Sequence, residues 1–359
     1  MKRILHVVST LAQGGTESVV LNYFSNMNKE EIIFDFLVIW GNSKKEYDDV
    51  LKSQGCRIYR MKNPPNRFCE HGKELKKFFD GNEYDIVHIH AMSSLRYRVA
   101  KIAKKSGVKT VIYHSHISSC DKNKLLHSLC KRILNKWCDY RFACSEVAGK
   151  FMYNSNFTII RNAIDLERYA FDNKKRKALR ERYGLQDKFV VGNIGRMTTV
   201  KNQKFLFPIL HLLARKEDAI LFLIGDGSEI DTLKETARQY EVTDRVIFAG
   251  NVGTEVCQYY SIFDCLAFPS RFEGLSMVLV EAQANGLPII ASDLLSDEHK
   301  ISNNFTFLPI TESDENYFVW AKSIIGCKNG RCDNMHVLEK AGYDIKTEAK
   351  KLQEFYLSL

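Results

Sequence analysis

Short apolar segments alternate with segments of helical period along this chain, and the alternation occurs twice. Strands that alternate with helices build a parallel sheet with helices on both faces. In the first half we expect five strands, at Ile4–Val8, Phe34–Ile39, Ile86–Ile89, Val111–Tyr113 and Phe142–Cys144. The segments between them predict helices at Ser18–Met27, Gly72–Asp80, Leu95–Ser106 and Lys124–Trp137. This half is therefore predicted to be a doubly wound α/β domain.

The second half repeats the pattern after a polar stretch at residues 162–177. Its predicted strands are Phe189–Ile194, Ile220–Ile224, Val246–Phe248, Leu266–Phe268 and Ile289–Ala291. Its predicted helices include Gln203–Ala214, Glu229–Tyr240 and Met277–Ala284. We therefore place one Rossmann-like domain at residues 1–165 and a second at 166–345, followed by a terminal helix at 346–359. Ligands of open α/β sheets bind outside the carboxyl ends of the strands, so two domains facing each other would form one ligand cleft.

Composition agrees with a soluble protein of two ordinary domains. Hydrophobic residues make up 45% and charged residues 26% of the 359 positions. The apolar run Ile4–Val8 is too short for the core of a signal peptide, and no run approaches the length of a transmembrane helix. The ten cysteines include no C-x-x-C pair, which favours reduced thiols. We expect a cytoplasmic protein.

Positive charge is concentrated in the first half. Residues 1–165 contain 27 Lys and Arg against 16 Asp and Glu, a net of +11, whereas the remainder contains 25 against 27, a net of −2. Between Arg96 and Lys136, eleven basic residues face one acid, Asp121. Such a patch attracts nucleic acid, an anionic membrane or an acidic substrate. Because the chain has no nucleic-acid-binding motif, we expect no nucleic-acid partner and regard residues 96–136 as a candidate surface for an anionic membrane.

An apolar stripe accompanies this charge at the end of the patch. Apolar residues recur there at helical spacing, at Leu125, Leu126, Leu129, Ile133, Leu134 and Trp137. Taken alone, the stripe favours a helix whose apolar side faces the core and whose basic side is solvated.

The segment from Pro269 to Pro288 contains two glutamates eight positions apart. It predicts a turn that enters a helix, which ends at Gly286. Eight residues are slightly more than two helical turns, so Glu273 and Glu281 would lie on one helix face, about 12 Å apart along the axis. Two carboxylates with this spacing suit the two ends of an elongated ligand.

A basic loop follows the first predicted strand of the second half. It contains Gly195, Arg196, Lys201 and Asn202, and a predicted helix comes directly after it. A guanidinium binds phosphate oxygens in a fork, and a lysine adds a compact charge. Anions are also favoured at helix starts. The loop therefore predicts a phosphate site.

Glycines follow two other predicted strands. Gly14 and Gly15 come after the first strand and open a helix that contains Glu17, while Gly225 and Gly227 follow the strand Ile220–Ile224. Glycine lets the backbone approach a ligand closely. These turns are candidate contacts for a phosphate or a sugar.

Four histidines end two neighbouring strands of the first half. His88 and His90 end one strand, and His114 and His116 end the next. A histidine can hydrogen-bond a sugar hydroxyl or a phosphate near neutral pH, so these residues are candidates for an acceptor side. For His6 alone we expect a packing role. Because no carboxylate can be placed beside the histidines, we expect no metal site.

The order and spacing of these motifs over residues 1–300 resemble the retaining glycosyltransferases of family 4, which have the GT-B fold of two facing Rossmann-like domains. The resemblance implies that Glu273 lies near the sugar, that Glu281 binds the ribose hydroxyls, and that His116 lies beside the reacting sugar. Further donor contacts implied are Gly14, Gly15, Gly195, Asn202, Gly225, Gly227, Gly274 and Leu275. His90, His114 and Glu17 would lie on the acceptor side, and the terminal helix at 346–359 would pack back on the first domain.

The resemblance also implies a reaction. A sugar would pass from a nucleoside-diphosphate sugar, most simply a UDP-sugar, to a glycan or polyprenyl-diphosphate-linked acceptor, as in enzymes that build capsular and exopolysaccharides. Arg196 and Lys201 would stabilise the leaving diphosphate. No metal and no other cofactor is then expected, which agrees with the lack of a D-x-D tripeptide. Two alternatives remain: a non-hydrolysing sugar-nucleotide epimerase on the same fold, and a nucleotide-sugar-binding protein without catalysis.

Overall fold

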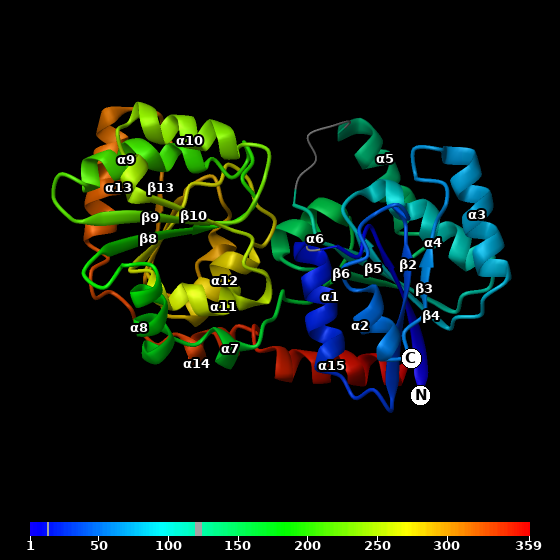
Figure 1. Cartoon of the computed structure of the whole chain (residues 1–359). Helices are drawn as coiled ribbons and strands as arrows, with labels where there is room; N and C mark the ends of the chain where they lie inside the picture. The colour runs from blue at the N-terminus through cyan, green and yellow to red at the C-terminus, as the bar shows by residue number, and fades with distance from the viewer. Residues whose placement is uncertain (13, 119–123) are drawn as a thin grey trace. The chain divides into compact units, whose positions relative to one another are not determined.

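The computed structural model describes residues 1–12, 14–118 and 124–359, and the chain forms two compact units (Figure 1). The first unit contains residues 1–164 together with residues 344–359, and the second contains residues 165–343. Asp121, the one acid of the basic patch, lies outside the described residues. Within the described ranges, none of the helices combines the length and apolarity needed to span a bilayer.

The first unit is built on a parallel sheet with the strand order β3-β2-β1-β4-β5-β6-β7. Its strands are β1 (Lys2–Val8), β2 (Ile32–Val38), β3 (Ile58–Arg60), β4 (Ile86–Ala91), β5 (Thr110–Ser115), β6 (Tyr140–Ala143) and β7 (Thr158–Ile159). The five predicted strands are confirmed. The two that sequence reasoning missed, β3 and β7, are the edge strands, and they are too short to show a period.

Helices cover both faces of this sheet (Figure 1). They are α1 (Gly15–Ser25), α2 (Asp48–Ser53), α3 (Phe68–Asp80), α4 (Tyr97–Lys105), α5 (Lys124–Leu134), α6 (Glu146–Met152) and α15 (Ile345–Ser358), with a short 3₁₀ turn η1 (Ser94–Arg96). The C-terminal helix α15 packs beside α1. Lys2 at the start of β1 donates to the carbonyl oxygen of Tyr356 at 3.1 Å, so the two ends of the chain meet in this unit.

The second unit has a parallel sheet with the order β10-β9-β8-β11-β12-β13. Its strands are β8 (Phe189–Ile194), β9 (Ala219–Ile224), β10 (Val246–Gly250), β11 (Cys265–Phe268), β12 (Ile289–Ser292) and β13 (Phe305–Leu308). Its helices are α7 (Leu166–Tyr169), α8 (Asn173–Arg182), α9 (Leu206–Leu213), α10 (Ile230–Gln239), α11 (Val256–Tyr259), α12 (Met277–Ala284), α13 (Asp314–Ile325) and α14 (Met335–Lys340). In both sheets the strand order reverses beside the first strand of the unit, between β1 and β4 and between β8 and β11. Open α/β sheets bind ligands in a crevice at the carboxyl ends of the strands at such a reversal.

Residues 300–345, which carry no recognisable motif, complete the core of the second unit. They supply β13, α13 and α14. Trp320 on α13 is fully buried, and its indole N–H donates to the carbonyl oxygen of Pro309 at 2.7 Å. Its ring packs edge-on against Phe205. This segment therefore has a packing role.

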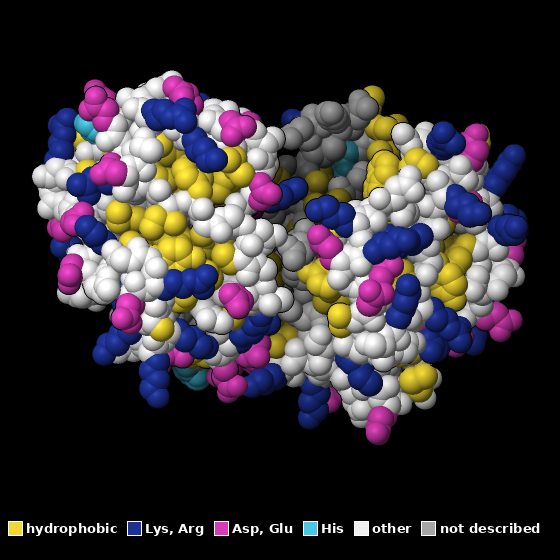
Figure 2. All heavy atoms as spheres, viewed as in Figure 1, with side chains coloured by type: hydrophobic (Ala, Val, Ile, Leu, Met, Phe, Trp, Pro, Cys, Tyr) yellow, Lys and Arg dark blue, Asp and Glu magenta, His cyan; other side chains and the backbone are white. Residues whose placement is uncertain are grey.

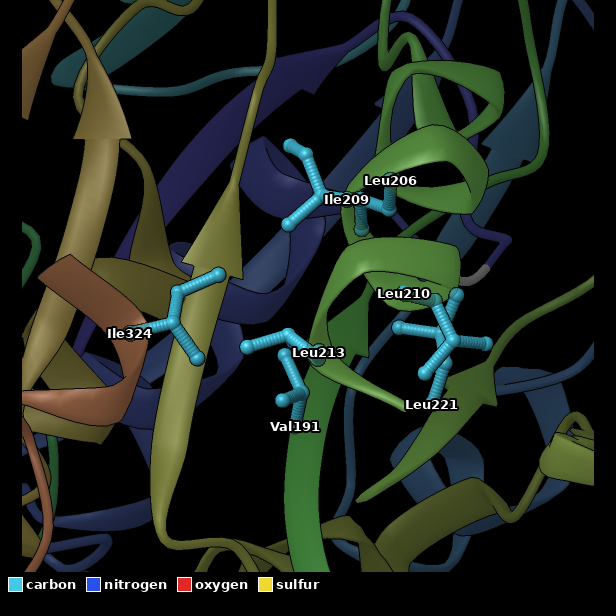
Figure 3. A pocket seen from close by; sticks show the side chains of 7 residues that line it. All are labelled: Val191, Leu206, Ile209, Leu210, Leu213, Leu221 and Ile324. Carbon is cyan, nitrogen blue, oxygen red and sulfur yellow. The ribbon is translucent and has the colours of Figure 1, made fainter. Parts of the chain in front are cut away.

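A small cavity in this core is apolar throughout (Figure 3). It measures about 10 Å³, and its lining comes from β8, β9, α9 and α13: Val191, Leu206, Ile209, Leu210, Leu213, Leu221 and Ile324. A space of roughly one water, without polar partners, holds neither a ligand nor an ordered water. This cavity is therefore a packing gap and not a binding site.

Helix α5 turns most of its apolar stripe to solvent, so the expectation that the stripe faces the core was wrong. Cys130 and Leu134 are buried, but Leu125 is 78% exposed. Three further members are exposed by 37–50%: Leu126, Leu129 and Ile133. The helix packs chiefly on η1 and α4, and this contact covers only one narrow side of it.

We expect Tyr356→Ala to lower the free energy of unfolding of the first unit by about 3–5 kcal/mol, the usual cost of deleting a buried aromatic ring. Tyr356 is fully buried, whereas its neighbour Leu357 is 40% exposed. Leu357→Ala, the matched control, should change the free energy by no more than about 0.5 kcal/mol. Urea titration of both variants measures the difference. Equal effects would show that α15 does not hold this unit together through its buried side.

Candidate functional site

Two glycine-rich loops pack against each other at the carboxyl ends of β8 and β9. Gly195 and Gly225 have φ angles of +155° and +134°, which favour glycine. A Cβ atom on Gly225 would lie 2.1 Å from the carbonyl oxygen of Gly195, and one on Gly227 would lie 2.2 Å from that of Met197. Gly225 and Gly227 are therefore required by the packing of one loop on the other, whatever ligand the loops contact.

An ion pair joins the basic loop to the loop after β11. Lys201 Nζ lies 2.5 Å from Glu273 Oε1, and Ser270 Oγ donates to the same oxygen at 2.6 Å. The two charged side chains are 19% and 11% exposed, so water screens the pair only partly. Pro269 accepts a hydrogen bond from the Asn202 amide at 3.3 Å, which ties the same two loops a second time. The sequence-predicted residues Lys201, Asn202 and Glu273 thus come together.

Glu273 does not lie on a helix, and the prediction that it shares a helix face with Glu281 was wrong. Helix α12 begins at Met277, with Ser276 as its N-cap. The preceding loop uses its backbone elsewhere, because Arg271 N–H donates to the carbonyl oxygen of Val200 at 2.8 Å. The loop therefore cannot continue the hydrogen-bond ladder of α12, and the axial spacing of about 12 Å does not apply.

Glu281 lies in α12 with its carboxylate buried. Tyr260 Oη donates to Glu281 Oε2 at 2.5 Å, and Tyr169 supplies a second hydrogen bond. Burial raises the pKa of Glu281, and the two tyrosine hydroxyls, with the positive charge of Arg168, act in the opposite direction. A carboxylate held in this way is positioned to accept hydrogen bonds from a polar ligand.

Arg196 is the exposed cation of this site. Its side chain makes no hydrogen bond or ion pair with any residue that the structure describes, although its carbonyl oxygen accepts from Gln203 at 3.1 Å. Five N–H donors are thus available for an oxyanion. Of the predicted cations, Arg196 is free while Lys201 is shared with Glu273.

The sequence analysis did not identify His299, which hydrogen-bonds the backbone of the loop that follows Glu273. It is 1% exposed, and its Nε2 accepts from the backbone N–H of Ser276 at 3.2 Å. Nδ1 donates to the carbonyl oxygen of Ser296 at 2.8 Å, which fixes the neutral tautomer. Burial lowers the pKa of His299, while the charge of Glu273 acts to raise it. The segment around His299 carries no motif, so only the folded structure reveals this contact.

In the first unit, the glycine turn is shaped around Glu17. Gly14 is the N-cap of α1, and a Cβ atom there would lie 2.6 Å from Glu17 Oε2. Thr10 Oγ1 donates to Glu17 Oε1 at 2.6 Å, and the glutamate is buried in the first helical turn, where a negative charge is favoured. A Cβ atom on Gly15 would meet no described residue within 4 Å apart from its chain neighbours and its own helix, so the described part of the turn is open there.

The predicted histidines form one buried group with His6. The histidine cluster consists of His6 on β1, His88 and His90 on β4, His114 on β5, and His116 directly after β5. His90 lies within hydrogen-bond distance of His6 at 2.9 Å and of His116 at 3.0 Å. Their rings therefore contact one another more than solvent, and all five are at most 7% exposed.

Burial keeps the members of this cluster uncharged. It lowers the pKa of His6 and of His116 to about 3. The pKa values of His88, His90 and His114 are also lowered, chiefly by burial and further by the neighbouring histidines. At neutral pH the cluster thus offers lone pairs and N–H donors, and not positive charge.

Comparison with known proteins identifies the family of this chain. The model described as "Glycosyltransferase Family 4" matches residues 13–168, and the one described as "Glycosyl transferases group 1" matches residues 175–320. A putative glycosyltransferase EpsF of Bacillus subtilis is 30% identical, over 99% of this chain and 96% of its own length. A UDP-Gal:alpha-D-GlcNAc-diphosphoundecaprenol alpha-1,3-galactosyltransferase of Escherichia coli is 23% identical, over 99% of this chain and 97% of its own.

Solved structures show the same fold over the whole chain. Anabaena Alr3699/HepE in complex with UDP and glucose has a TM-score of 0.80, at 18% identity and full coverage of both chains. WaaG, a glycosyltransferase involved in lipopolysaccharide biosynthesis, has a TM-score of 0.70 at 15% identity, with 98% of this chain and 99% of WaaG covered. With matched family models on both units and a relative of 30% identity along nearly all of its length, the chain belongs to the family-4 glycosyltransferases and has the GT-B fold.

Proposed function

We propose that the protein is a retaining glycosyltransferase that moves a hexose from a nucleoside-diphosphate sugar to a lipid-linked glycan in the synthesis of a surface polysaccharide. A UDP-sugar is the proposed donor. The observation that carries the proposal is the exposed Arg196 beside the Lys201–Glu273 pair at the strand ends of the second unit. The E. coli relative is named for a UDP-galactose donor and a diphosphoundecaprenol acceptor, and HepE was crystallised with UDP and glucose.

The chemical task is to stabilise the leaving diphosphate. Its negative charge grows as the bond to the sugar breaks, so cations fixed nearby stabilise the transition state more than the ground state. Arg196 supplies a fork of donors. The ammonium of Lys201 has three N–H groups, of which Glu273 occupies one, so Lys201 is held in place with donors to spare. In this proposal the charge is provided without a divalent metal or another cofactor.

Retention is proposed to occur by attack on the same face of the sugar within an ion pair. A double displacement would need a carboxylate nucleophile, and Glu273 is the candidate by position in the motif. Its Oε1 already accepts hydrogen bonds from Lys201 and Ser270, which withdraw electron density and reduce nucleophilicity. Glu273 is therefore assigned to positioning Lys201 and binding the sugar, and His116 to a contact with the reacting sugar.

Arg196→Ala and Lys201→Ala should each lower turnover by at least about 10²-fold, the usual cost of losing one preorganised charge contact in the transition state. Steady-state release of UDP, measured in excess EDTA with the acceptor present and absent, tests this. Lys204→Ala is the matched control, because Lys204 follows the same loop but pairs with Glu312 at 3.7 Å. The control should keep wild-type turnover.

Two outcomes would contradict the proposal. Wild-type turnover in both loop variants would contradict the role proposed for Arg196 and Lys201. Activity that appears only with added Mg²⁺ or Mn²⁺ would assign the stabilisation of the diphosphate to a metal ion. Conversion of the UDP-sugar into its epimer without acceptor would instead favour the sugar-nucleotide epimerase that the sequence leaves open, whereas UDP release that depends on acceptor would exclude it.

Glu281→Gln should weaken donor affinity more than it lowers turnover. A ribose contact is shared by the ground and transition states, so its loss appears mainly in KM. The amide keeps the size of the side chain and a carbonyl oxygen that can accept from Tyr260. Isothermal titration with UDP measures the affinity directly, and Tyr260→Phe, which loses only the hydroxyl that holds the carboxylate, should give a smaller loss. Unchanged UDP affinity in Glu281→Gln would remove this residue from the donor site.

We also propose that the first unit binds an anionic membrane through α5, which would keep the protein peripheral at the inner leaflet, next to a lipid-linked acceptor. The exposed residues Leu125 and Leu129 lie on the same helix as Lys124 and Arg132, which are exposed too. Figure 2 shows hydrophobic side chains gathered over α5. Leu95 in η1, which contacts α5, is 49% exposed and extends this apolar surface.

Reversing Lys131, Arg132 and Lys136 to Glu should weaken binding to anionic vesicles by at least about 10²-fold, since each basic residue near an anionic leaflet contributes about 1 kcal/mol and the new acids are repelled. Co-sedimentation with phosphatidylglycerol vesicles at low and high salt measures this. Reversal of Lys174, Lys175 and Lys177 on α8 of the second unit is the charge-matched control. Wild-type protein that ignores anionic vesicles, or binds phosphatidylcholine equally well, would refute the membrane contact.

A further inference from the structure

The histidine cluster holds more polar nitrogen than its own hydrogen bonds use. Nε2 of His6, Nε2 of His88 and both ring nitrogens of His114 are buried without a hydrogen-bond partner among the described residues. His6 and His88 are each 1% exposed. A buried polar atom without a partner is rare in folded proteins and calls for a function or a bound group. His88 also belongs to a group of three histidines whose ring nitrogens lie close together, so its unpaired Nε2 points to a bound ligand there.

The spacing of three members suits one metal ion. One ring nitrogen from each of His6, His88 and His90 lies within 4.8 Å of the other two. Nitrogen ligands at about 2.0–2.1 Å from a tetrahedral Zn²⁺ are about 3.3–3.4 Å apart. His6 Nδ1 and His90 Nε2 are 2.9 Å apart, so a shift of a few tenths of an ångström brings them to this separation.

The outer contacts are also those of metal-binding histidines. A ligating histidine almost always hydrogen-bonds a fixed partner through its other ring nitrogen, which sets its tautomer and orientation. His88 Nδ1 is 2.5 Å from Tyr356 Oη on α15, which leaves Nε2 free. His90 Nδ1 is 3.0 Å from His116 Nε2. Phe34 stacks on His6 at 3.7 Å between ring centroids and shields the group from water.

We propose that His6, His88 and His90 bind one first-row divalent metal ion, with Zn²⁺ as the best match, in the core of the first unit. Three neutral imidazoles are a ligand set that proteins use for Zn²⁺, with water or hydroxide in the fourth position. Imidazole ligands suit Zn²⁺, Cu²⁺, Ni²⁺ and Fe²⁺ better than Mg²⁺ or Ca²⁺.

This site stabilises the first unit and takes no part in the leaving-group chemistry proposed for the second. The expectation from the sequence that no metal binds the histidines depended on the lack of carboxylates. It did not foresee that His6 on β1 would join His88 and His90 on β4, because the neighbours of a strand are not visible in the sequence. His90 also belongs to a second group of three, with His114 and His116. Because both groups share His90, one ion per chain is expected.

The test uses full-length protein without a histidine tag, unfolded in EDTA and refolded with one equivalent of Co²⁺ or Zn²⁺. We expect one Co²⁺ per chain with the visible absorption of a tetrahedral ion, displacement by Zn²⁺, and a higher melting temperature of the first unit in the loaded protein. His88→Phe, which keeps an aromatic ring, should bind Co²⁺ at least 10²-fold more weakly. Tyr356→Phe should weaken binding by about 10–100-fold, as losses of an outer contact do.

Two controls separate the site from other histidines. His336→Ala removes an exposed histidine of the second unit and should leave Co²⁺ binding unchanged. His114→Phe should leave it largely unchanged as well, since His114 belongs only to the second group. Loss of binding in His114→Phe with retention in His88→Phe would overturn the assignment. Wild-type protein that takes up less than a stoichiometric amount of either metal, with no tetrahedral spectrum, would overturn the site itself, even if the His88 variant failed to fold.

Discussion

The ion pair between Lys201 and Glu273 determines the geometry of the donor-side loops. The two residues are 72 positions apart, and they meet because β8 and β11 are neighbours in the sheet, so that their carboxyl ends release both loops at one edge. The pair fixes an ammonium that would otherwise be mobile and occupies a carboxylate that would otherwise repel a diphosphate. Arg196 remains unpaired among the described residues, so the loop that precedes the helical turn Gln203–Phe205 presents net positive charge. His299 and Asn202 hold the two loops in place by hydrogen bonds to the backbone.

Buried polar groups distinguish both units from ordinary cores. In the second unit, Glu281 is buried, and two tyrosine hydroxyls compensate part of the cost of removing its charge from water. In the first unit, five histidines occupy positions where apolar residues would pack at no electrostatic cost. Such groups are costly for stability and are usually retained for a function. We assign ligand binding to the buried carboxylate of the second unit and metal binding to the buried histidines of the first, in line with the two proposals.

The C-terminal helix links the ends of the chain to that histidine cluster. Tyr356 is 268 positions from His88, yet its hydroxyl lies 2.5 Å from the imidazole. Lys2 contacts the backbone of the same helix turn. Helix α15 thus contacts β1 through Lys2 and β4 through His88. A metal bound by the cluster would therefore stabilise the helix and the sheet together.

The sequence alone determined the two parallel sheets, since apolar period and strand–helix alternation are local properties, and all ten predicted strands are present. It also identified the basic loop, because strand, glycine and helix start are adjacent in the chain. The sequence analysis wrongly placed Glu273 on a helix, because hydrogen bonds between the backbones of distant loops cannot be read from local sequence. It also wrongly predicted that the apolar stripe of α5 faces the core, because the number of elements packed around a helix is not a local property either. Only the tertiary structure paired Lys201 with Glu273 and brought His6 to His90. Strand order decides such contacts, and it depends on the packing of the whole sheet and not on the spacing of residues along the chain.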